Sequence, residues 1–140
     1  YLPDAARLDL GLRQSYHAAD VAPFDTRGMD PAPVMAMRPR LAPPTLVLSS
    51  RFPVFGIWRY NSVRGADKPP RGPQDVLIAR RSFDPAPQLL PPGGLPLARA
   101  LKGRLTLAEA LTRAMAEVPE ADPAALLTLF LTSGALTLAP

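Results

Sequence analysis

The fold is decided by residues 89–138, which read LLPPGGLPLARALKGRLTLAEALTRAMAEVPEADPAALLTLFLTSGALTL. The spacing of apolar residues, prolines and glycines predicts a short strand that ends in a Pro-Gly turn, three short helices and a closing apolar strand. That order is typical of a winged-helix-like module. We therefore expect an α+β fold, in which one N-terminal helix precedes a small β-sheet and a winged-helix-like, three-helix C-terminal half.

The ends of these helices carry local signals. Thr106 and Glu109 have the spacing of a capping box, in which the hydroxyl and the carboxylate each bind a free amide at the helix start. Asp122 is a good N-cap residue, and Pro123 fits the first helical position. Gly134 can adopt the left-handed conformation that ends a helix. An apolar stripe supports the middle helix at Leu107, Ala110, Leu111, Ala114, Met115 and Val118.

Outside this stretch, many of the 19 prolines divide the chain into short elements. Residues 1–19 predict the N-terminal helix, with Leu8, Leu12, Tyr16 and Ala19 along its apolar face. The other predicted elements are strands at 34–41, 45–50, 75–81 and 88–90, a helix that begins at Pro53, a loop at 62–74 and a turn at 83–87.

Three regions are expected from this order. The chain begins inside the predicted helix, so we interpret residues 1–20 as the terminal helix of a truncated upstream helical domain. Residues 21–33 are rich in aspartate, glycine and proline and predict a linker. Residues 34–140 then form the C-terminal α+β domain, whose length suits a single domain.

The chain has no cysteine, which excludes disulfides and thiolate metal sites and fits the cytoplasm. No apolar run reaches the length of a membrane span and no signal peptide is recognisable, so we expect a cytoplasmic protein without a membrane contact. The single histidine, His17, lies at the end of the first predicted helix, where it suits pairing with carbonyl groups better than metal binding. We expect neither a metal nor another cofactor.

Positive charge is concentrated in the middle of the chain. Residues 38–81 hold nine basic residues against Asp67 and Asp75, a balance of +7. The basic residues are Arg38, Arg40, Arg51, Arg59, Arg64, Lys68, Arg71, Arg80 and Arg81. Such a region can bind nucleic acid, an acidic peptide or an acidic partner protein, or it can be an ordinary solvated surface.

The most aromatic stretch, SRFPVFGIWRYN at residues 50–61, lies inside this basic region. Its arginines and the nearby Arg64 could form a surface that stacks bases and binds phosphates. We favour a second interpretation, in which the aromatic rings belong to the core and the arginine stems cover them. If a partner binds here, the candidate partner-facing residues are Arg51, Trp58, Arg59 and Arg64.

No stretch of the chain has the pattern of a catalytic centre. The serines lack a G-x-S-x-G setting, Gly93-Gly94 is not part of a phosphate-binding loop, and no paired carboxylates lie within an apolar run. We expect no catalytic residues and no enzyme activity. The predicted helix at 123–132 also lacks the Arg, Lys, Asn or Gln side chains that a base-reading helix needs. Any contact with nucleic acid would therefore use the basic residues at 38–81 and the phosphate backbone.

Two segments and one order of elements resemble a bacterial family of HvfC-like proteins, whose members are labelled as DNA-binding-domain proteins. The segments are YLPDAARLDLGLRQSYHAAD at residues 1–20, with its Tyr16–Asp20 motif, and SRFPVFGIWRYN at residues 50–61, with Arg51, Pro53, Ile57 and Trp58. The order is the strand DVLIARR, a Pro-Gly turn, a short helix and TLAEAL. The resemblance spans nearly the whole chain but includes only the end of the first of the family's two domains.

The resemblance implies a non-enzymatic accessory protein. HvfC-like proteins are partners of iron-dependent oxidases that modify small ribosomally made peptides, and the partner is thought to help present the peptide. The sheet of such a module could bind the peptide as an added strand. The competing implication is DNA binding in transcriptional regulation, which the family's label attaches mainly to the first domain. We expect a protein- or peptide-binding accessory module, with DNA binding as the alternative.

Overall fold

The computed structural model describes residues 1–140 as an α+β fold. Its elements in chain order are α1 (Leu2–His17), α2 (Pro31–Ala36), β1 (Arg40–Leu41), β2 (Leu46–Ser50), α3 (Val54–Ser62), β3 (Gln74–Arg80), β4 (Pro85–Leu89), α4 (Gly94–Leu101), α5 (Leu107–Glu117), α6 (Pro123–Thr132) and β5 (Leu136–Thr137).

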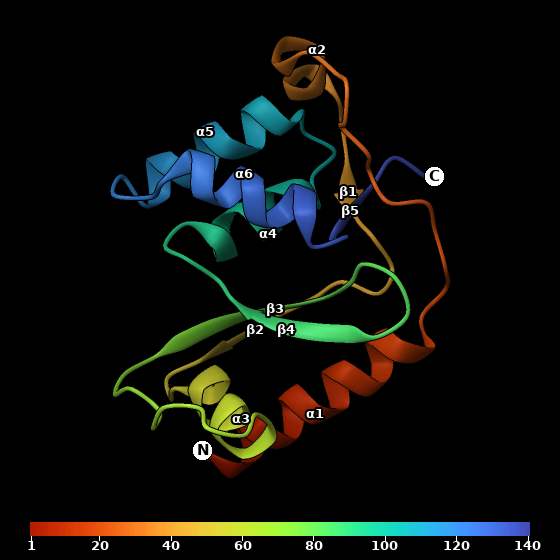
Figure 1. The fold of residues 1–140 in the computed structure, drawn as a ribbon. Coiled ribbons are helices and arrows are strands. Elements are labelled where there is room, and N and C mark those ends of the chain that lie inside the picture. The colour runs from red at the N-terminus through yellow and green to blue at the C-terminus, as the bar shows by residue number, and fades with distance from the viewer.

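The sheet β2-β3-β4 is antiparallel and lies between two layers of helices, with α1 and α3 on one face and α4, α5 and α6 on the other (Figure 1). The central strand β3 is buried on both faces along its apolar run VLIA. Val76 and Ile78 join the small core beneath α1 and α3, whereas Leu77 and Ala79 join the larger core beneath α4, α5 and α6. The alternation of side chains along one strand therefore supplies both cores.

The expected helices of the C-terminal half are confirmed. Thr106 and Glu109 form the capping box of α5, with the Glu109 N to Thr106 Oγ1 distance at 3.1 Å and the Thr106 N to Glu109 Oε2 distance at 2.8 Å. The side chain of Asp122 caps α6 by accepting from the amides of Ala124 and Ala125. The closing strand β5 pairs with β1 in a separate two-stranded ladder and not with β4.

The strand expected at 34–41 is wrong over most of its length, because α2 occupies its first residues. Asp30 precedes a proline at the first helical position, an arrangement that starts a helix. Val34 lies in this helix, and its side chain is buried. The expected linker is also packed against the domain. The amide of Phe24 donates to the Leu136 carbonyl at 2.8 Å, and the Phe24 side chain is buried.

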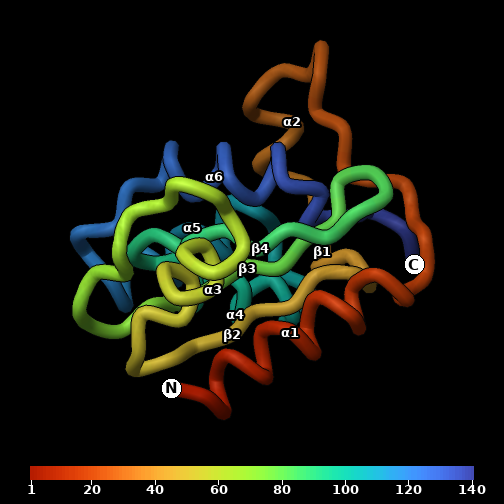
Figure 2. Tube along the Cα trace, turned by 60° about the horizontal axis from the view of Figure 1, so that its bottom comes forward, coloured from red at the N-terminus to blue at the C-terminus, as the bar shows by residue number.

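Helix α1 packs against the sheet and runs beside β2 (Figure 2). Leu8 is buried against the sheet, and a Cβ atom at Gly11 would lie 2.6 Å from Ile78 Cδ1. Ser15 is buried and donates to the Pro44 carbonyl at 2.6 Å. The expected apolar face was therefore only partly right, since small residues take the closest contacts and Tyr16 is 55% exposed. The structure joins residues 1–20 to residues 34–140, whereas a further upstream domain stays a prediction.

The C-terminal end of α1 is held by Arg80, the last residue of β3. Its Nη1 donates to the carbonyls of Ser15 at 2.9 Å and Tyr16 at 2.6 Å, and its Nη2 donates to the carbonyl of Ala18 at 2.9 Å. Nη2 also lies 2.7 Å from Asp20 Oδ1, and only 6% of the Arg80 side chain is exposed. A cation at this position satisfies carbonyls that the helix leaves free and opposes the partial negative charge of the helix end.

The N-terminal end of α1 is tied to the end of β2. Ser50 Oγ donates to Asp4 Oδ2 at 2.6 Å and accepts from the Phe52 amide at 3.0 Å. Arg7 Nη1 also donates to Asp4, at 3.0 Å. The hydrogen bond from Ser50, followed by that from Arg7, lowers the pKa of Asp4 below its ordinary value of 3.8.

We expect Arg80→Met to lower the free energy of unfolding by about 2 kcal/mol, because it leaves partly buried carbonyls without a charged donor while it keeps an apolar stem. Arg81→Met is the matched control, since Arg81 is exposed and its replacement should change stability by less than about 0.5 kcal/mol. Urea unfolding measures both values. Equal effects of the two substitutions would contradict the role assigned to Arg80.

Acid should weaken the tie between α1 and β2. The pKa of Asp4 is lowered in the folded protein, so its contribution to stability is complete above the unfolded-state pKa and is lost as the pH falls through the folded-state pKa. We expect Ser50→Ala to be less stable than the unaltered protein at neutral pH, and the difference to shrink below pH 3.8. Urea unfolding over a pH series tests this. A difference independent of pH would mean that Ser50 acts only through Phe52.

Candidate functional site

The four candidate partner-facing residues lie around α3. Arg51 is exposed directly after β2, with Cζ 5.4 Å from the centre of the Phe52 ring. Trp58 is half-buried, packs against the small core and stacks on Phe55, with ring centres 6.1 Å apart. Arg59, in the last turn of α3, and Arg64, just after α3, are both exposed. The structure therefore places three cations at the surface and one aromatic ring partly within the core.

Most of the basic region has no acidic partner. Arg80 pairs with Asp20 as described, and Arg38 Nη1 lies 3.8 Å from Glu109 Oε2. Seven basic side chains of residues 38–81 have no carboxylate within 4.0 Å, and these are Arg40, Arg51, Arg59, Arg64, Lys68, Arg71 and Arg81. This part of the surface is therefore positive in the folded protein, not only in the sequence.

One edge of the three-stranded sheet, β4, is blocked by proline. The amide of Leu90 donates to the Asp75 carbonyl at 2.8 Å, so alternate residues of β3 from Asp75 onward bond to β4. Pro85 and Pro87 fall in the intervening pairs, where their nitrogen atoms face away from β3. Proline has no N–H to offer there, and such prolines protect an edge from a further strand. The expected turn at 83–87 was wrong from Pro85 onward, where the chain forms β4. Prolines fit this strand because residues in these pairs donate no hydrogen bond to β3.

The opposite edge, β2, is open. The remaining residues of β3 bond to Leu46, Leu48 and Ser50, so Val47 and Ser49 turn their N–H and C=O groups away from the sheet. No backbone hydrogen bond from another segment reaches either residue. Ser49 is exposed and Val47 is half-buried. This edge therefore presents two donors and two acceptors, and the exposed guanidinium of Arg51 follows directly.

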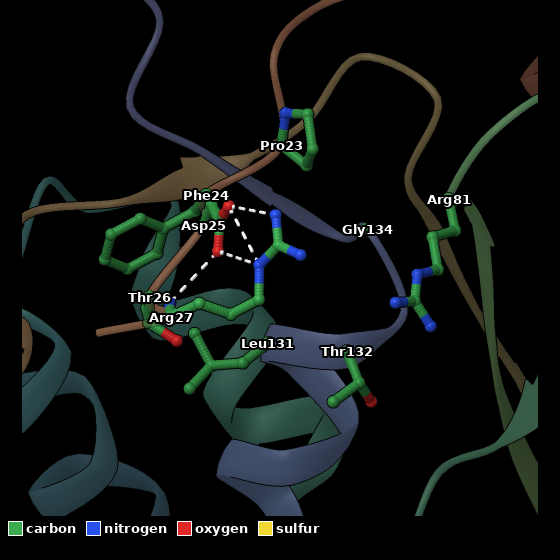
Figure 3. Close-up of a pocket in the computed structure, with 9 residues that line it drawn as sticks. All are labelled: Pro23, Phe24, Asp25, Thr26, Arg27, Arg81, Leu131, Thr132 and Gly134. Carbon is green, nitrogen blue, oxygen red and sulfur yellow. Dashed lines mark hydrogen bonds and ion pairs between the residues drawn. The ribbon is translucent and has the colours of Figure 1, made fainter. Parts of the chain in front are cut away.

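A cleft of about 350 Å³ lies between the segment at 23–27, the C-terminal end of α6 and Arg81 (Figure 3). It is lined by Pro23, Phe24, Asp25, Thr26, Arg27, Arg81, Leu131, Thr132 and Gly134. Arg27 binds Asp25 through Nε at 3.0 Å and Nη2 at 2.7 Å, and its amide donates to Asp25 Oδ1 at 3.0 Å. These bonds lower the pKa of Asp25 to about 2, so the ion pair persists at neutral pH. Arg81 lies across the cleft from Arg27, and no carboxylate lies within 4.0 Å of its guanidinium.

Sequence reasoning found neither the open edge nor this cleft. The alternation of Pro85 and Pro87 with other residues was a usable sign of a protected edge strand. Asp25, two residues before Arg27, was a usable sign of a side-chain turn. The openness of β2 and the approach of Arg81 to the segment at 23–27 depend on distant contacts and leave no local pattern.

No group of three or more His, Cys, Asp or Glu side chains gathers in the structure. None of the helices combines the length and the apolar character that a membrane crossing requires. Comparison of the chain with protein-family models, curated proteins and solved structures finds no match. The resemblance to the HvfC-like family therefore stays a prediction.

Gly134 forms part of the cleft wall, has a φ of +79° and ends α6 as expected. A Cβ atom there would lie 2.8 Å from the Arg80 carbonyl oxygen and 2.8 Å from Arg81 Cα. We expect Gly134→Ala to lower the free energy of unfolding by about 2–4 kcal/mol, because left-handed backbone costs alanine at least about 1 kcal/mol and overlap adds about 1–3 kcal/mol.

Gly28→Ala provides the control for this substitution. Gly28 has a φ of +76°, but a Cβ atom there would meet no atom within 4 Å. Only the backbone cost applies, so its loss should be about 1 kcal/mol. Urea unfolding of both variants measures the difference. Equal losses would show that the close approach of Gly134 to the end of β3 contributes nothing to stability.

Proposed function

We propose that this chain is a non-enzymatic accessory module that binds an extended peptide along the outer edge of β2. The observation that carries the proposal is the contrast between the two sheet edges. Pro85 and Pro87 block β4, whereas Val47 and Ser49 leave their backbone groups unpaired on β2. A strand that joins an exposed edge is a general mode of peptide recognition.

The backbone contacts alone would supply modest affinity. Four hydrogen bonds to Val47 and Ser49 would contribute about 0.5–1.5 kcal/mol each, and immobilising the peptide offsets part of that gain. Side chains of the peptide must therefore add to binding. Arg51 follows the edge directly, and the surface of this region carries seven unpaired cations. We infer that the preferred peptide is acidic.

The resemblance to HvfC-like proteins supports the same function independently of the sheet edges, because it rests on the sequence of residues 1–20 and 50–61. It implies that the partner is an iron-dependent oxidase and that the bound segment belongs to the small peptide which the oxidase modifies. The absence of cysteine fits a place in the cytoplasm. The chain would then hold the peptide for the oxidase and supply no catalytic group itself.

We expect Ser49→Pro to weaken binding of an acidic, extended peptide because the site at the β2 edge is lost, with the small peptide encoded beside this chain's gene as the probe. Proline removes the outward-facing amide of Ser49 and leaves every hydrogen bond between β2 and β3 in place. Fluorescence anisotropy of the labelled peptide measures the affinity, and circular dichroism checks the fold.

Ser49→Ala is the matched control, because it removes the hydroxyl and keeps the amide. It should bind as the unaltered chain does, while Arg51→Gln should bind up to about fivefold more weakly through loss of one surface charge contact. Equal affinity of the folded Ser49→Pro variant and the control would rule out the edge of β2 as the binding site.

DNA binding is the alternative function, and the seven unpaired cations favour it specifically. Contacts with phosphates would lose affinity steeply as salt rises, because each contact releases a counterion. A titration of random duplex DNA and the peptide at low and physiological salt separates the two functions. Peptide binding that survives added salt supports the accessory module, whereas DNA binding that disappears with salt, without peptide binding, supports the alternative.

A further inference from the structure

A second, apolar hollow of about 230 Å³ adjoins the cleft shown in Figure 3. The second hollow is lined by Thr26, Met29, Pro31, Val34, Met35, Leu127 and Leu131. Thr26 and Leu131 line both hollows, so the two are neighbours, and the pair is called the groove below. Its walls are α6 on one side and the segment from Pro23 to Met35 on the other.

One end of the groove is cationic. Arg81 is exposed and has no acidic partner. Arg27 is 91% exposed and uses Nε and Nη2 for Asp25, so its Nη1 donates to no group of the chain. Figure 3 shows the guanidinium of Arg27 turned toward the Gly134 side of the cleft, where Arg81 also lies. Two guanidinium groups with free donors at one cleft suit a carboxylate.

The other end of the groove is apolar and adaptable. Met29 and Met35 are half-buried, as are Leu127 and Leu131. Methionine side chains adjust to varied partners because they are unbranched and polarisable. This end therefore suits aliphatic side chains of more than one shape.

We propose that the groove binds a peptide segment in which a carboxylate stands beside aliphatic side chains. The carboxylate contacts Arg81 and Arg27, and the aliphatic side chains lie against Met29, Met35 and Leu127. The class of the occupant rests on the proposed peptide-binding function, and the charge of the cleft selects an acidic segment. The groove is separate from the edge of β2, so it is a second contact site for the same kind of ligand.

The four methionines of the chain provide direct reporters, because each gives one signal when its methyl group is labelled with carbon-13. The probe is a blocked peptide that contains two leucines followed by one glutamate, and its matched partner has glutamine in place of glutamate. We expect the signals of Met29 and Met35 to shift on addition of the glutamate peptide, while Met115 on α5 stays unchanged. The glutamine peptide should bind about fivefold more weakly, since it loses a charge contact at a partly exposed site.

Arg81→Gln should weaken binding of the glutamate peptide by a similar factor, whereas Arg13→Gln, which replaces an exposed arginine of α1 outside both proposed sites, should leave it unchanged. Ser49→Pro should also leave the Met29 and Met35 shifts unchanged, so failure of the β2 site and failure of the groove give different results. Unmoved Met29 and Met35 signals, or an Arg81→Gln variant that binds as well as the original, would overturn the proposal. Dodecanoate that shifts these signals while the glutamate peptide does not would overturn it in favour of a lipid carboxylate.

Discussion

The buried guanidinium of Arg80 is the constraint on which the rest of this structure depends. A nearly fully buried cation is costly unless its donors are satisfied, and here the free carbonyls at the end of α1 and the carboxylate of Asp20 satisfy them. The bond network joins the central strand to the helix that covers one face of the sheet. It also determines where the chain leaves α1, and so where the segment that contains Phe24 and Asp25 begins its path along β5 and α6.

The two edges of the sheet show how the same fold prevents one association and permits another. Proline at alternate positions of β4 removes donors from that edge without loss of a ladder bond, because only residues that face β3 need an N–H. Nothing equivalent protects β2, where Val47 and Ser49 keep both donors and acceptors. Natural proteins usually protect exposed edges. The proposed peptide site rests on this contrast and on the unpaired Arg51 next to the open edge.

Sequence reasoning succeeded where a signal and its effect lie within a few residues. The Thr106 capping box, the Asp122 cap and the glycine end of α6 all appear as predicted, because each acts on the backbone beside it. It failed where packing decided the outcome. The apolar face expected for α1 included Tyr16, but the closest contact uses Gly11, because the helix approaches Ile78 too closely for a side chain.

The sequence by itself determined the α+β class, the bounds of α5 and α6, the presence of strand β3 and the positive charge of the middle region. All of these follow from local spacing, capping chemistry and composition. Only the tertiary structure decided the fates of two adjacent arginines. Arg80 follows Val76 and Ile78 on the α1 face of the sheet and is buried, whereas Arg81 lies at the cleft beside α6 and remains exposed. Strand alternation sends neighbouring side chains in opposite directions, but which direction meets a helix end depends on how distant segments pack.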